Sequence, residues 1–177
     1  MTSLFRAAIA GGALALAVTA AHAQEESTNN VAVKTDWNVF VETDPTECWS
    51  VSPPKKTVNS RDGQVVSVRR GEILLFVTFR PGDGIKGEVS FSGGYPFKPG
   101  STVALTVGDS NFDLFTEGEW AWPASKADDA KIIEAMKRGA EAELVGFSSR
   151  GTKTADTFSL YGFTAAMDEA ARRCSGN

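Results

Sequence analysis

The chain has 177 residues, with 18 Lys and Arg against 22 Asp and Glu, which gives a formal net charge of −4 at pH 7. The length suits one domain with a buried core. The acidic balance argues against a nucleic-acid partner, because phosphate backbones bind basic surfaces. The single histidine is His22. The rest of the chain therefore lacks the residue most often used for acid–base catalysis at neutral pH, and a non-catalytic protein is expected.

The N-terminal residues 1–23 have the organisation of a secretory signal peptide. Arg6 precedes an apolar run over 7–18, and Ala21-His22-Ala23 is a cleavage site with small flanking residues. A retained anchor helix is the alternative, although the apolar run is short for a membrane span. We predict export to the periplasm, the cell surface or the medium, with no membrane-spanning segment after cleavage. Residues 24–35 are polar and predict a flexible leader before a single domain over 36–177.

The pattern from residue 36 onward is mostly that of β-strands. Residues 73–79 form a continuous apolar run, which is typical of a buried central strand. Other short apolar-polar alternations are separated by turns rich in Gly, Asn, Asp and Pro. This arrangement predicts a mainly β protein built as an antiparallel β-sandwich. The expected strands cover about 37–41, 48–51, 65–68, 73–79, 89–91, 103–107, 112–116, 120–122, 142–147 and 157–161.

Two short helices interrupt the strands in the C-terminal half. Ser125 can cap the first helix, and Gly139 suits its C-terminal end. The second helix is predicted over about 163–173. Its apolar residues recur at helical spacing and would form one buried face: Phe163, Ala166, Met167, Ala170 and Cys174.

The only two cysteines are Cys48 and Cys174. An even pair in an exported chain predicts a disulfide. Such a bond would clamp the second helix to the strand that carries Cys48. A pair of free thiols, one of them nucleophilic, is the alternative, but no nearby histidine is available to activate a thiolate.

Several short motifs match known sites and are interpreted as accidental. Residues 82–87 match the dinucleotide-binding G-x-G-x-x-G, but a strand pattern follows where a helix is required. The S-x-x-K match at 52–55 contains two prolines and lacks its companion motifs. Residues 109–113 resemble half of a calcium loop, and a tight turn is predicted there. We therefore expect no metal and no cofactor. The basic pairs at 55–56 and 69–70 are interpreted as solvated surface.

Aromatic side chains supply the candidate binding surface. Our first hypothesis is that the protein binds a protein partner, with these residues as contact points. Its support is the β-sandwich pattern, the absence of histidine after residue 23, and the exposed edges of such sheets, which can accept a further strand. The alternative is carbohydrate binding, with cleavage by the carboxylates at 113, 117 and 119 as its weaker form. Packing in the core or at a sheet edge is the simplest interpretation of the two tryptophans. The candidate residues are Tyr95, Phe97, Trp120 and Trp122.

A longer pattern joins several of these features. Trp37 and Cys48 are followed by Ser148-Ser-Arg-Gly151, then by Phe158-Ser-Leu-x-Gly-Phe-x-x-Ala166, and then by the terminal cysteine. The pattern spans nearly all of the chain after residue 23, and it resembles the invasion-associated locus B family of exported bacterial proteins. The resemblance implies an immunoglobulin-like β-sandwich, a location in the periplasm or at the cell surface, and no established catalytic residues. Many members carry a C-x-x-x-G-C segment where this chain reads 115–122 without cysteine.

Overall fold

The computed structural model describes residues 29–44 and 46–175. The predicted signal peptide and the start of the predicted leader, residues 24–28, lie outside the described residues. A short 3-10 turn, η1 (Pro81–Asp83), follows β6. The helices are α1 (Lys126–Arg138) and α2 (Phe163–Ser175), and the strands are β1 (Asn30–Lys34), β2 (Trp37–Thr43), β3 (Thr46–Ser52), β4 (Lys56–Arg61), β5 (Gln64–Val65), β6 (Leu74–Arg80), β7 (Ile85–Ser92), β8 (Thr102–Val107), β9 (Ser110–Glu117), β10 (Trp120–Trp122), β11 (Glu141–Phe147) and β12 (Lys153–Ser159).

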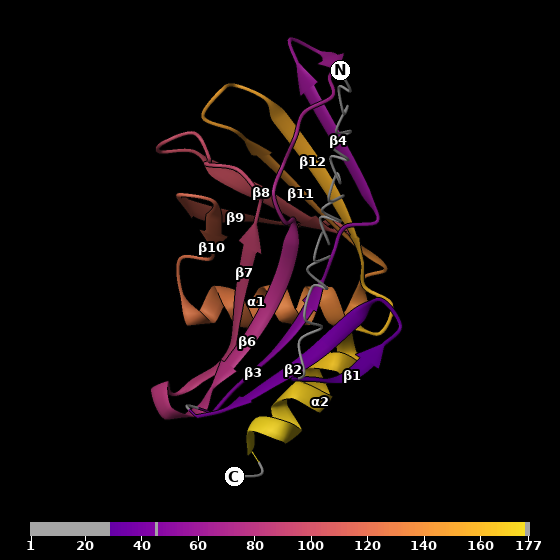
Figure 1. Ribbon diagram of the computed structural model, residues 1–177, viewed down its shortest axis with the longest axis vertical. Helices are drawn as coiled ribbons and strands as arrows, with labels where there is room; N and C mark the ends of the chain where they lie inside the picture. The colour runs from indigo at the N-terminus through magenta and orange to yellow at the C-terminus, as the bar shows by residue number, and fades with distance from the viewer. Residues whose placement is uncertain (1–28, 45, 176–177) are drawn as a thin grey trace, which may run out of the picture.

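The twelve strands of the described residues all join one antiparallel sheet, in the order β1-β2-β3-β6-β7-β10-β9-β8-β11-β12-β4-β5. The mainly β class and the two helices in the C-terminal half are confirmed. The described strands form one continuous sheet, so the two sheets of an immunoglobulin-like sandwich are not seen as separate units. The reason is the short strand β10, which pairs with β7 on one side and with β9 on the other. Figure 1 shows the two halves of the sheet lying at an angle to each other.

The sheet curls around a single hydrophobic core. Phe91 on β7 meets Phe158 on β12 with ring centroids 6.0 Å apart, although the two strands are five places apart in the sheet. On β6, Leu75, Val77 and Phe79 point into the core while the residues between them are only half-buried, as the two-residue period of a strand requires. Helix α1 crosses the sheet against β7, and α2 packs on β2 and β3 (Figure 1).

Helix α2 is fixed to the sheet by one covalent and one aromatic contact. Cys48 on β3 and Cys174 on α2 form the predicted disulfide, and neither cysteine is free. Trp37 is fully buried, its ring lies edge-on to Phe163 at 4.9 Å, and its Nε1 donates to the Ser159 carbonyl oxygen at 2.9 Å. The predicted apolar face of the helix is therefore buried against β2 and β3.

The two outer regions of the sheet contain strands that the sequence pattern did not predict. Residues 30–34, assigned to a flexible leader, form β1, whose Val31 and Ala32 pack against the core. Lys34 also reaches Glu169 on α2 at 3.7 Å. The polar segment Lys56–Arg61 forms β4 through pairing with β12. β1 lies at one edge of the sheet and β4 lies next to the edge strand β5, so water covers part of their surfaces and their apolar periodicity is weak.

Substitution of Gly162 by alanine is expected to destabilise the protein more than the same change at Gly118. Both glycines have positive φ, at 88° and 58°. A Cβ at Gly162 would lie 1.9 Å from the Lys34 carbonyl oxygen, whereas one at Gly118 meets nothing within 4 Å. The left-handed backbone alone costs about 1–2 kcal/mol. Urea denaturation of the two variants measures the additional steric cost, and equal losses would contradict the close packing of β1 against the start of α2.

Candidate functional site

Four aromatic side chains form a patch on the sheet. The Phe76 and Trp120 rings are 5.6 Å apart, and Trp120 stacks on Trp122 at 6.3 Å with 19° between the ring planes. Trp122 is paired directly with Phe115 across β9 and β10. Phe76 alternates with the core residues of β6, so the patch lies on the face turned away from the core. We call Phe76, Phe115, Trp120 and Trp122 the aromatic patch.

Two of the four side chains in the aromatic patch are exposed to solvent. Phe115 is 56% exposed and Trp120 is 39% exposed. Trp122 is half-buried between them. Of the two simple interpretations from sequence, core or edge packing, burial in the core does not hold for Trp120. The sheet presents a rigid aromatic surface because both tryptophans sit on one strand with hydrogen-bonded neighbours on each side.

The other two predicted surface residues, Tyr95 and Phe97, do not extend the aromatic patch. Phe97 is 5% exposed and packs against Phe91, with ring centroids 6.1 Å apart. A Cβ at Gly93 would lie 2.6 Å from the Phe97 ring, so the missing side chain of Gly93 makes room for it. The prediction that Phe97 is a contact residue is therefore wrong, because the loop turns this ring into the core. Tyr95 is half-buried and lines a separate pocket.

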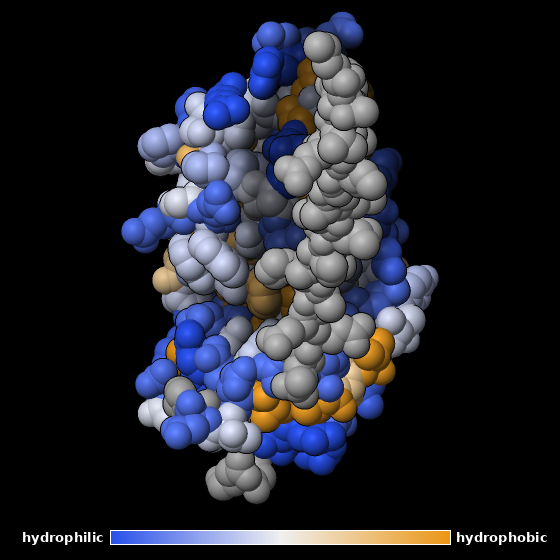
Figure 2. Space-filling model, in the orientation of Figure 1, coloured by the Kyte–Doolittle hydropathy of each residue, from blue (hydrophilic) through white to orange (hydrophobic). Residues whose placement is uncertain are grey.

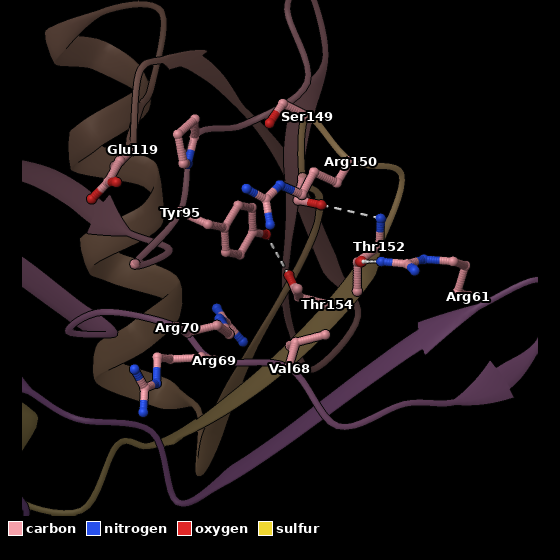
Figure 3. A pocket seen from close by; sticks show the side chains of 13 residues that line it. Arg61, Val68, Arg69, Arg70, Tyr95, Glu119, Ser149, Arg150, Thr152 and Thr154 are labelled. Carbon is pink, nitrogen blue, oxygen red and sulfur yellow. Dashed lines mark hydrogen bonds between the residues drawn. The ribbon is translucent and has the colours of Figure 1, made fainter.

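That pocket has a volume of about 490 Å³ and lies between the β11–β12 turn, the segment before β6 and the loop after β7 (Figure 3). A volume of this size is within the range of small-molecule sites, about 300–1,000 Å³. We call it the arginine pocket. Its charged lining residues are Arg61, Arg69, Arg70, Arg150 and Glu119.

One wall of the arginine pocket rests on a buried ion pair. Arg70 Nη1 and Nη2 donate to the two carboxylate oxygens of Asp156 at 2.7 and 2.6 Å, and the side chains are only 5% and 0% exposed. Arg70 Nε and Nη2 also donate to the Gly93 carbonyl oxygen. The interpretation of residues 69–70 as a solvated basic pair is therefore wrong for Arg70, because this bidentate geometry compensates its charge inside the protein.

Tyr95 is held against this ion pair. The Arg70 guanidinium lies over the Tyr95 ring, 4.9 Å from its centroid. The Tyr95 hydroxyl lies 2.5 Å from Thr154 Oγ1. Burial raises the pKa of Tyr95, because the charged phenolate is poorly solvated there. At neutral pH Tyr95 therefore keeps its proton, and its hydroxyl remains a hydrogen-bond donor.

The β11–β12 turn supplies the opposite wall. Thr152 N donates to Ser148 Oγ at 3.1 Å, and Ser149 N donates to the Pro96 carbonyl oxygen at 2.9 Å. These bonds fix the turn, from which Arg150 extends toward Tyr95 (Figure 3). Arg61 approaches from β4, where its Nη2 donates to Thr152 Oγ1 at 2.8 Å.

The short motifs take the structures expected of accidental matches. The segment 82–87 forms the β6–β7 turn and the start of β7, with no helix following it. Residues 109–113 form the tight β8–β9 turn and part of β9, and Ser52 ends β3. Among the described residues, no group of three or more His, Cys, Asp or Glu side chains could hold a metal ion. The helices that the structure describes are all too short or too polar to cross a membrane.

Among the described residues, the sheet ends at β1 on one side and at β5 on the other. Val33 on β1 is 63% exposed and Val65 on β5 is 79% exposed. Figure 2 shows hydrophobic side chains gathered over β1 and β2 in the lower part of the molecule. Exposed strand edges of this kind can accept a further strand from a partner.

These features define a disulfide-linked, mainly β protein with a single curled sheet, an aromatic surface patch and an arginine-lined pocket. The chain belongs to the Invasion associated locus B (IalB) protein family, whose model matches residues 37–171. The family predicted from the residue pattern is thereby confirmed. A comparison with curated proteins found no match.

A solved structure supports the fold. The crystal structure of invasion associated protein b from Bartonella henselae is similar to this chain with a TM-score of 0.55 and 14% sequence identity. The similarity covers 80% of this chain and 95% of that chain. At this identity the likeness concerns the fold alone.

Sequence reasoning did not find the arginine pocket. Its residues come from β4, the segment before β6, the loop after β7 and the β11–β12 turn, and they meet only after the sheet has curled. The one local signal was the Ser148-Ser-Arg-Gly151 segment, which forms the rigid turn under Arg150.

Proposed function

We propose that this chain is an exported, non-catalytic protein of the bacterial envelope that binds a protein partner through the aromatic patch. The observation that carries the proposal is the accessible, rigid pair Trp120 and Phe115, at 39% and 56% exposure, supported by Trp122 and Phe76. Tryptophan and other large aromatic residues supply much of the binding free energy in protein interfaces. The rim is polar, with Glu117 and Glu119 next to the patch, as interfaces commonly are.

Export to the periplasm or the cell surface is part of this proposal. It is supported by the family membership, by the signal-like residues 1–23 and by the Cys48–Cys174 disulfide, which is typical of an oxidising compartment. The immunoglobulin-like description of the fold is likewise a proposal. Its support is the contact of Phe91 with Phe158, through which the two halves of the curled sheet pack face to face.

The double variant Trp120→Ala/Trp122→Ala is expected to lose a discrete partner when tagged protein is chemically crosslinked in intact cells. Removal of both indoles takes two of the four rings from the patch, and neither is among the buried core residues. Phe147→Ala is the matched control, because Phe147 is also an exposed aromatic residue, at 42%, on a different strand. Mass spectrometry of the captured proteins is the measurement. If the double variant captures the same proteins as the control, the patch does not bind the partner.

Carbohydrate binding is the second candidate function, and a specific observation favours it. The Trp120 and Trp122 rings are nearly parallel, with 19° between their planes, and flat aromatic surfaces can stack on sugar rings. Titration with soluble cell-wall glycan fragments, followed by tryptophan fluorescence, tests this function. A shift that is absent in Trp120→Ala would support it, whereas unchanged fluorescence at millimolar ligand would exclude it in favour of the protein partner.

A further inference from the structure

The arginines fall into two groups, those that have a carboxylate partner and those that do not. Within residues 29–44 and 46–175, five arginines have a carboxylate oxygen at 3.4 Å or less: Arg70, Arg80, Arg138, Arg172 and Arg173. Arg61, Arg69 and Arg150 have no carboxylate partner among the residues described there. All three of these line the arginine pocket.

The charge of the pocket is therefore positive in a chain whose formal net charge is −4. Asp156 neutralises Arg70. Glu119 is the one carboxylate among the residues that line the pocket. The lining thus carries an excess of about two positive charges at neutral pH, which a dianion would balance.

The groups that could contact an anion are arranged around one space. Arg150 extends toward Tyr95 from the β11–β12 turn, and Arg61 approaches from the other side of that turn (Figure 3). Arg61 is held in place by Thr152 Oγ1 at 2.8 Å. The fixed turn below Arg150 and the buried Arg70–Asp156 pair below Tyr95 orient the walls before any ligand arrives, which reduces the entropic cost of binding.

We propose that the arginine pocket binds a phosphate monoester carried on a small polar molecule. A phosphate monoester has a charge of about −1.5 to −2 at pH 7, and guanidinium groups match its oxygens with paired hydrogen bonds. Arg61 and Arg150 contact the phosphate, Arg69 adds positive potential at the margin, and Glu119 accepts a hydrogen bond from a hydroxyl of the carrier. The cavity of about 490 Å³ leaves room for that carrier. Glu119 borders both this site and the proposed partner surface, but the phosphate proposal does not rest on partner binding.

Isothermal titration calorimetry at low ionic strength tests the proposal with four probes: glucose 6-phosphate, inorganic phosphate, glucose 6-sulfate and glucose. Glucose 6-phosphate is expected to bind, the monoanionic sulfate ester to bind more weakly, and glucose not to bind. Arg61→Gln and Arg150→Gln are each expected to weaken binding of glucose 6-phosphate by about tenfold or more. Arg138→Gln is the matched control, because Arg138 is an exposed arginine paired with Glu134 on α1. It is expected to leave the affinity unchanged.

The comparison of probes also identifies the source of the phosphate. Tighter binding of glucose 6-phosphate than of inorganic phosphate assigns the site to an ester, and equal affinities assign it to the free anion; either result supports phosphate recognition. Equal binding of glucose and glucose 6-phosphate would overturn the proposal, as would no heat of binding at about 10 mM phosphate ester. Full affinity in folded Arg61→Gln/Arg150→Gln would also overturn it. The Trp120→Ala/Trp122→Ala variant retains both arginines, so failure of partner binding leaves this result unaffected.

Discussion

Asp156→Ala is expected to destabilise the protein by about 3–5 kcal/mol, the usual cost of leaving one charge of a buried pair without its partner. Asp156 is fully buried, and the Arg70 side chain is 5% exposed, so water cannot replace the lost carboxylate. The same change also removes the support beneath Tyr95 and the 93–97 loop, because Arg70 bonds the Gly93 carbonyl oxygen. Urea denaturation measures the loss.

Two further variants separate the charge effect from the loss of packing. Asp113→Ala is the matched control, since Asp113 is an exposed aspartate on β9, and it is expected to change the stability by no more than about 0.5 kcal/mol. The double change Asp156→Leu/Arg70→Met is expected to recover much of the lost stability, because neither charge is then left unpaired in the buried site. If Asp156→Ala costs no more than Asp113→Ala, the ion pair does not hold this part of the structure together.

Cys174→Ser is the second large effect, with an expected loss of about 2–5 kcal/mol. The disulfide links residues that are 126 positions apart, so its removal frees a long loop in the unfolded chain. The loss should be concentrated at α2, which is the element that Cys174 fixes to β3. Hydrogen exchange along α2 and thermal denaturation are the measurements.

Comparison of the single and double cysteine variants controls for a free thiol. Cys48→Ser/Cys174→Ser is expected to match Cys174→Ser closely, because either change breaks the same bond. Reduction of the wild-type protein with dithiothreitol should reproduce the loss without any substitution. An unchanged melting temperature in Cys174→Ser would mean that packing of Phe163, Ala166 and Met167 alone holds α2 in place.

The parts of the fold that depend on local chemistry could be predicted from the sequence. Ser125 caps α1 as its position suggested, with its Oγ accepting a hydrogen bond from Asp128 N at 3.3 Å. The apolar face of α2 carries Cys174 inward, as its spacing indicated. In both cases the signal comes from residues within a few positions of one another, where the helical period determines the result.

The parts that depend on long-range contacts could not be predicted. Whether the strands form one sheet or two is decided by three residues of β10, which bridge β7 and β9. The direction of the Phe97 ring depends on space left by Gly93, and the partner of Arg70 is 86 positions away in the sequence. The spacing of residues along the sequence does not indicate such long-range contacts. The aromatic residues of the 93–97 loop could therefore be identified from the sequence, but the direction of the Phe97 ring could not.

Site-specific photocrosslinking in intact cells tests the partner-binding function most directly. A photoreactive residue at position 115 would lie in the aromatic patch, whereas one at position 147 would replace another exposed aromatic residue outside it. We expect the probe at 115 to form one discrete crosslinked product that disappears when Trp120 is also replaced by alanine, and the probe at 147 to form none. Identical products from both positions, or no product from position 115 in abundant folded protein, would contradict partner binding by this surface.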